Sequence, residues 1–77
     1  MNFAYDKVVG ARIREEREAR GMTQEQLAAR LQTKGCDVTR SALAKMEVGQ
    51  RHIYTDEIRL IKDIFNVSFD VLLPRLL

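Results

Sequence analysis

Two stretches carry the pattern that decides the fold: residues 10–31, GARIREEREARGMTQEQLAARL, and residues 38–50, VTRSALAKMEVGQ. In the first stretch, Thr23 and Gln26 have the spacing of a capping box, in which each side chain bonds the backbone N–H of the other residue. We therefore expect a helix that starts at Thr23 and ends at Gly35. Its buried stripe is Leu27, Ala28 and Leu31.

The second stretch predicts a short helix over residues 40–48, with Thr39 as its N-cap and Gly49 at its end. Leu43 and Met46 are the positions that face inward. A short helix that is packed on one face and exposed on the other can enter the major groove of DNA. Arg and Lys donate to guanine O6 and N7, and Ser serves donor or acceptor edges. The outward, base-reading candidates are Arg40, Ser41, Ala44 and Lys45. The alternative is an ordinary amphipathic surface helix.

Further helices flank this core on both sides. Residues 7–20 have helical periodicity and stop at Gly21. A later helix is expected to start at Thr55 as N-cap, and a short fifth helix near Ser68. The fold class is therefore all-α: a compact bundle of four to five short helices in a single domain over residues 1–77.

Several motifs in order resemble the phage repressor/Cro family, the Xre-type helix-turn-helix proteins. They are RIREEREARG at residues 12–21, MTQEQLA at 22–28, S-x-L-x-K-M-E-x-G at 41–49 and NVSFDVLL at 66–73. The resemblance implies a lambda-repressor-like domain that binds double-stranded DNA in a sequence-specific manner.

The resemblance also implies residue roles. Gln24 is expected to contact the DNA backbone at the start of the second helix, where free amides suit a phosphate; the alternative is that Gln24 is merely solvated. Arg17 and Glu47 are expected to form a structural ion pair, because an inward-facing charge needs a partner; the alternative is two surface charges. Further backbone candidates are Thr23, Thr39 and Arg51.

Two departures from the family pattern lie next to the third helix. The sequence QTKGCD lies between Leu31 and Val38, so we expect a longer connection before the third helix. Val48 stands where the family has a polar, phosphate-facing residue. Arg51 and His52 follow and are candidates to replace that contact, with a solvated loop as the alternative.

Positive charge gathers in the middle of the chain. The whole chain has a net charge of +2, but residues 30–54 hold five basic residues against two acidic ones, which suits an anionic partner. With one Cys and one His, neither a disulfide nor a zinc site is expected. We expect no cofactor, no small-molecule ligand and no membrane partner, and a cytoplasmic location. Acidic groups are scattered without a nucleophile–base pattern, so an enzyme is not expected.

The C-terminal third has more apolar residues than short helices readily bury. Such a surplus usually marks an interface, so we expect a homodimer. The candidate interface residues are Leu60, Ile64, Phe69 and Leu72. Internal packing of a fifth helix is the alternative. The predicted function is a repressor that binds a palindromic operator as a homodimer; the alternative is an antitoxin-like or protein-interaction module of the same fold.

Overall fold

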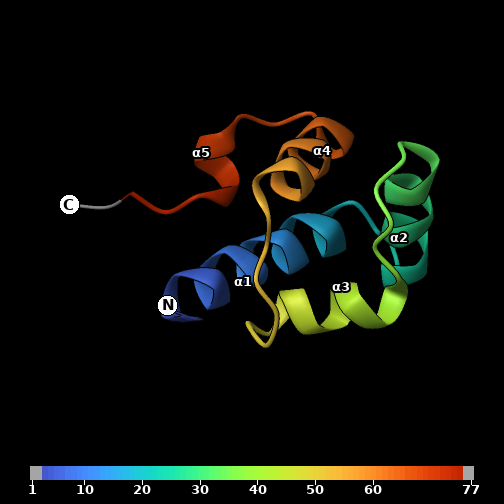
Figure 1. The fold of residues 1–77 in the computed structure, drawn as a ribbon. Coiled ribbons are helices and arrows are strands. Elements are labelled where there is room, and N and C mark those ends of the chain that lie inside the picture. Colours follow the sequence, from blue (N-terminus) through green and yellow to red (C-terminus); the bar gives the residue numbers. More distant parts are fainter. Residues whose placement is uncertain (1–2, 76–77) are drawn as a thin grey trace.

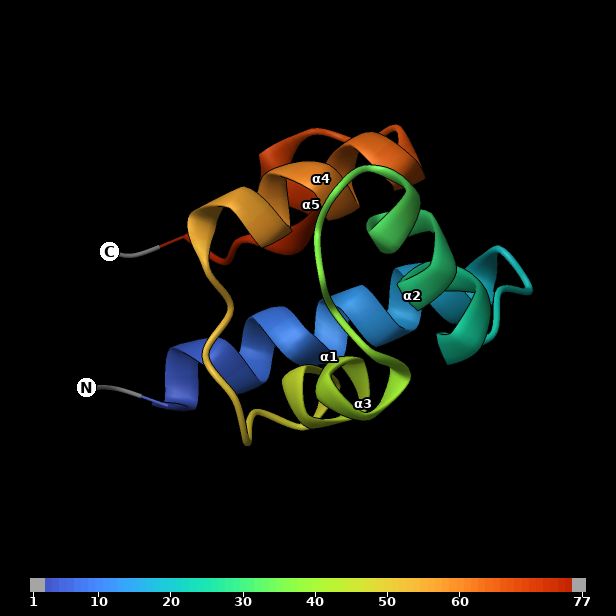
Figure 2. The same cartoon turned by 45° about the vertical axis from the view of Figure 1, so that its right-hand side comes forward.

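The computed structural model describes residues 3–75 and folds them into five helices, with no strand in that range. The helices are α1 (Phe3–Ala19), α2 (Gln24–Thr33), α3 (Arg40–Glu47), α4 (Thr55–Phe65) and α5 (Phe69–Leu72). The prediction of an all-α bundle is confirmed. In Figure 1 and Figure 2, α1 runs through the middle of the molecule, with α3 on one side and α4 and α5 on the other. None of the helices within residues 3–75 has the length and apolar character needed to cross a membrane.

Two side-chain caps start the helices that carry the decisive motifs. The Thr23 hydroxyl accepts a hydrogen bond from the Gln26 N–H at 3.1 Å, and the Gln26 side-chain carbonyl accepts one from the Thr23 N–H at 2.8 Å. This is the capping box expected from the sequence. Thr39 caps α3, because its hydroxyl accepts from the Ala42 N–H at 3.1 Å. Local side-chain chemistry therefore sets where both helices begin.

Two helix starts differ from the prediction. α1 begins at Phe3 rather than Lys7, because Tyr5 packs against the core and its hydroxyl donates to the Pro74 carbonyl at 3.4 Å. The N-cap of α4 is Tyr54 rather than Thr55. The Glu57 carboxylate accepts from the Tyr54 backbone N–H at 2.9 Å, which satisfies a helix-terminal donor one residue before Thr55.

The core draws on all five helices and on the connection between α2 and α3. Its buried apolar residues are Val9, Ile13, Leu27, Ala28, Leu31, Cys36, Val38, Leu43, Met46, Ile58, Ile61, Phe65 and Leu72. Leu72 is fully buried, so its assignment to a subunit contact is wrong. The reason is that α5 packs on α1 and α4 and turns Leu72 inward. Leu60 and Ile64 are half-buried against the same core, whereas Phe69 is 40% exposed.

α1 and α3 come very close where Gly10 faces the end of α3. A Cβ atom on Gly10 would lie 2.0 Å from the Met46 carbonyl oxygen. Gly49, just after α3, is similarly close to Lys7, and a Cβ there would lie 2.7 Å from the Lys7 Cβ. Gly49 also has a φ of 78°, which favours glycine. The two glycines therefore let the C-terminal end of α3 rest directly on the α1 backbone.

An ion pair holds the connection between α3 and α4. Arg51 donates from Nη1 and Nη2 to the two Glu57 carboxylate oxygens at 2.9 and 2.8 Å, and from Nη1 to the His52 carbonyl at 2.8 Å. Burial raises the pKa of Glu57, but hydrogen bonds from Arg51 and the Tyr54 N–H outweigh burial and leave this pKa below its ordinary value. A hydrogen bond between His52 Nδ1 and the Asp6 carboxylate ties the same connection to α1.

Replacing Gly10 by Ala tests the close approach. In an open helix this change stabilises by about 1 kcal/mol, but overpacking against a fixed neighbour costs about 1–3 kcal/mol. Because the neighbour is a backbone oxygen, we expect Gly10→Ala to lower the free energy of unfolding, measured by urea denaturation. Glu15→Ala, on the exposed side of α1, should change it by no more than about 0.5 kcal/mol. A Gly10→Ala variant as stable as the wild type would show that α3 can move off α1 without cost.

The depressed pKa of Glu57 predicts a pH dependence. Because the folded pKa lies below the ordinary value of 4.5, the unfolded chain binds more protons between the two values. The stability that Glu57 contributes is therefore full above about pH 4.5 and is lost as the pH falls through the folded pKa. In urea titrations, the stability gap between the wild type and Glu57→Gln should narrow as the pH is lowered through this window. A gap that stays constant would contradict the assignment.

Candidate nucleic-acid interface

α3 presents one face to the core and the opposite face to solvent. Leu43 and Met46 are fully buried, and Glu47 is 4% exposed. The outward face consists of residues that the sequence proposed as base readers. Arg40, Ser41 and Lys45 are exposed, and Ala44 is half-buried. The helix therefore offers two cations and a hydroxyl on one side while its other side is anchored.

The anchor is an ion pair between Arg17 and Glu47. Arg17 Nε lies 2.7 Å from Glu47 Oε2, and Arg17 Nη2 donates to Oε1 at 3.0 Å. The two side chains are 9% and 1% exposed. The hydrogen bonds that Arg17 donates to Glu47 raise the pKa of Arg17 above its ordinary value, although burial opposes them, so the guanidinium stays charged. The arrangement is a bidentate pair, the stronger geometry for Arg and a carboxylate.

Two further contacts extend this pair to the turn before α2. Arg17 Nη1 donates to the Met22 carbonyl at 2.7 Å, and Gln24 Nε2 donates to Glu47 Oε1 at 3.0 Å. Gln24, proposed from the sequence as a phosphate contact, therefore has its amide nitrogen directed at Glu47. The first turn of α2 is thereby held beside the end of α3.

Arg40 lies next to α2 as well. Its Nε is 3.4 Å from Glu25 Oε1, and both side chains are largely exposed. The sequence analysis did not predict this pair. Glu25 is the second residue of α2 and Arg40 the first of α3, so the contact depends on the tertiary packing of α2 against α3.

The remaining candidates for contact with the DNA backbone are two N-cap residues and one arginine. Thr23 and Thr39 are exposed N-caps, so each sits at a helix start that faces outward. Arg51, proposed for the DNA backbone, donates from Nη1 and Nη2 to the Glu57 carboxylate. Val48 is 46% exposed at the end of α3.

The long connection before α3 is packed rather than loose. Val38 is fully buried, and its carbonyl accepts from Gln32 Nε2 at 3.1 Å. The Cys36 N–H donates to the Leu31 carbonyl at 2.9 Å. Burial is the main cause that raises the pKa of the Cys36 thiol, which makes it a weaker nucleophile. The expected long connection is present, and it holds the start of α3 firmly.

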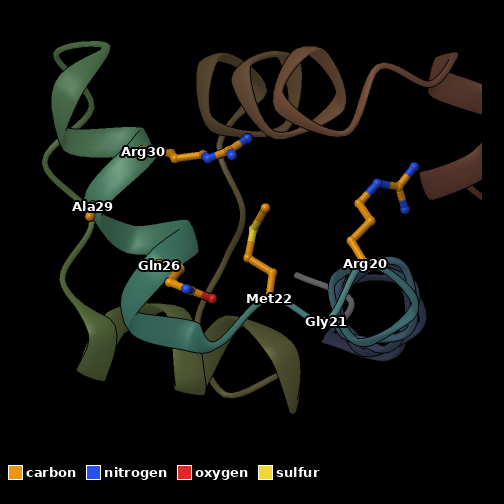
Figure 3. Close-up of a pocket in the computed structure, with 6 residues that line it drawn as sticks. All are labelled: Arg20, Gly21, Met22, Gln26, Ala29 and Arg30. Atoms are coloured by element: carbon orange, nitrogen blue, oxygen red, sulfur yellow. The ribbon is translucent and has the colours of Figure 1, made fainter.

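A hollow lies between the end of α1 and α2. Figure 3 shows Arg30 extending toward it from α2, Met22 between Arg30 and Arg20, and the Arg20 side chain extending away from Arg30. Arg20 is already occupied, because it donates to the Phe65 carbonyl and to the Glu16 carboxylate, each at 2.9 Å, and lies over the Phe65 ring. Arg20 therefore caps the C-terminal end of α4 and is structural.

Breaking the anchor tests its contribution to stability. Glu47→Gln would leave the Arg17 guanidinium buried without a matching charge, which typically costs about 3–5 kcal/mol. We expect a clear fall in the melting temperature and in the free energy of unfolding. The matched control is Glu18→Gln, which breaks an exposed pair between Glu18 and Arg14, both on α1. This change should cost at most about 0.5 kcal/mol. Equal effects of the two substitutions would contradict the anchoring role.

Comparisons with known proteins agree with this geometry. The model of the helix-turn-helix family matches residues 13–72, a range that contains α2 to α5 and part of α1. The crystal structure of the DNA-binding domain of BldD is similar in fold, with a TM-score of 0.78 and 22% identity, over 96% of this chain and 100% of that chain. A search of curated proteins gave no match. The chain belongs to the helix-turn-helix family of the phage repressor/Cro (Xre) type, as its sequence motifs indicated.

Proposed function

We propose that this chain is a DNA-binding transcription regulator that inserts α3 into the major groove. The observation that carries the proposal is the anchoring of α3. Its inner side is fixed by Leu43, Met46 and the Arg17–Glu47 pair, and its outer side carries Arg40 and Lys45. A rigid helix with an outward basic face is what base reading in the groove requires.

The outward side chains of α3 take the base-reading roles. Arg40 and Lys45 donate to guanine O6 and N7, Ser41 pairs with donor or acceptor edges, and Ala44 contacts a thymine methyl. The starts of α2 and α3, capped by Thr23 and Thr39, take the backbone roles. Gln24 contributes to the same phosphate contact while its amide nitrogen is held by Glu47. Arg51 is not included among the backbone contacts, because both of its terminal nitrogens donate to the Glu57 carboxylate.

A second copy of the chain is part of the proposal. One recognition helix reads only a few base pairs, too few to select a site in a genome. Apolar side chains of α4 and α5 support a two-fold contact. Phe69 and Val71 on α5 are exposed, and Leu60 and Ile64 on α4 are half-buried. Pairing through these side chains would place two α3 helices about 34 Å apart on a palindromic operator. Occupying such an operator blocks transcription, so we propose a repressor acting in the cytoplasm.

Binding to duplex DNA is tested by fluorescence titration. The affinity for a random-sequence duplex should fall at least about tenfold between about 50 and 200 mM salt, because bound phosphates release counterions. Replacing both Arg40 and Lys45 by Ala should weaken binding and flatten the salt dependence. Arg14→Ala, an exposed change on α1, serves as the control with little effect. Wild-type protein that binds no duplex at low salt would reject the proposed function.

The subunit contact is tested by sedimentation velocity, with and without a palindromic duplex selected from a random library. Phe69→Asp should shift the protein toward monomer and weaken binding to the selected duplex, because a buried charge opposes an apolar contact. Val8→Asp is the matched control, since Val8 on α1 is 43% exposed and Phe69 is 40% exposed. If the wild type stays monomeric both alone and on the duplex, the homodimer proposal fails.

A further inference from the structure

Glu25 places a negative charge where the proposed function needs an anion to approach. It is the second residue of α2, and its side chain is 71% exposed. The free N–H groups and the dipole of a helix start attract phosphate. A carboxylate at the same helix start reduces that attraction. The Glu25 carboxylate also interacts favourably with the dipole of α2, but an uncharged polar residue would be tolerated at this position. The negative charge of Glu25 therefore points to a second role.

The contact between Glu25 and Arg40 indicates that role. The carboxylate oxygen Oε1 lies 3.4 Å from Arg40 Nε. The distance given for this exposed ion pair is to Nε, and the guanidinium carries four further N–H donors on its two terminal Nη groups. Bidentate recognition of guanine O6 and N7 uses two such donors side by side. An exposed pair of this kind contributes little to folding stability.

We infer that Glu25 is a positioning residue that orients Arg40 for one guanine of the operator half-site. The inference rests on the proposed function. Without a partner, the long Arg40 side chain samples many rotamers and also pairs with phosphates, which carry no sequence information. With Glu25 Oε1 at 3.4 Å from Nε, the guanidinium is restrained beside the first turn of α2. Glu25 thus lowers affinity for DNA in general and raises selectivity for guanine.

Lys45 gives an internal comparison. It is the other outward cation of α3, and among residues 3–75 no acidic side chain is paired with it. A guanine contacted by Lys45 should therefore be insensitive to Glu25. The effect of Glu25 is expected at one guanine of the half-site and absent at the other.

The experiment uses the full chain and a duplex selected from a random library by the wild-type protein. Each guanine is replaced in turn by 7-deazaguanine, which lacks the N7 acceptor. The guanine contacted by Arg40 is the one whose replacement lowers the affinity of the wild type, by about fivefold or more, but does not change the affinity of Arg40→Ala. Glu25→Gln should reduce the ratio of affinities for the guanine and 7-deazaguanine duplexes at this position by about two- to fivefold. It should also raise the affinity for a random-sequence duplex. Glu15→Gln makes the same charge change on the outer side of α1 and is the control.

The double variant separates positioning from direct contact. In the Arg40→Ala background, Glu25→Gln should have no further effect on discrimination. If it still has one, Glu25 contacts a base itself, such as the amino group of cytosine, and the positioning role is wrong. Discrimination that Glu25→Gln leaves unchanged also overturns the inference. Both results leave DNA binding intact, whereas a wild type that binds no duplex rejects the proposed function. Thermal unfolding of Glu25→Gln should match the wild type, because the pair is exposed.

Discussion

The ion pair between Arg17 and Glu47 joins the three segments on which the rest of the molecule depends. Its arginine lies near the end of α1, its glutamate is the last residue of α3, and the same guanidinium also holds the Met22 carbonyl in the turn before α2. Glu47 in turn accepts from Gln24 at the start of α2. A buried charge without these partners would be costly. The relative placement of α1, α2 and α3 is therefore set by satisfying one buried pair.

Close packing of α3 against α1 further restrains the helices that the ion pair joins. Because Gly10 has no side chain, the Met46 carbonyl at the end of α3 can lie against α1. Hydrogen bonds made by Arg51 and His52 hold the next segment against α4 and α1. α3 is thus restrained at its end as well as along its inner side. These restraints fix the position of the α3 backbone from which the outward side chains extend.

The cations of this chain have two different uses that composition alone does not separate. Arg17, Arg20 and Arg51 are engaged by carboxylates or backbone carbonyls and act inside the fold. Arg40 and Lys45 lie on the exposed side of α3, where a polyanion can reach them, although Arg40 also forms an exposed pair with Glu25. The net charge of +2 therefore does not show which cations face outward on α3.

The sequence by itself determined the features that depend on neighbouring residues. The Thr23–Gln26 spacing predicted the start of α2, and Leu43 and Met46 predicted which side of α3 faces outward. Both follow from helix geometry within a few residues. The Arg17–Glu47 pair was accessible only through the resemblance to a family. The tertiary structure alone decided that Leu72 is buried, that Arg51 belongs to Glu57, that Gly10 meets Met46 and that Glu25 lies beside Arg40. Each of these depends on which segments and helix faces pack together in space, and periodicity along the chain contains no information on that choice.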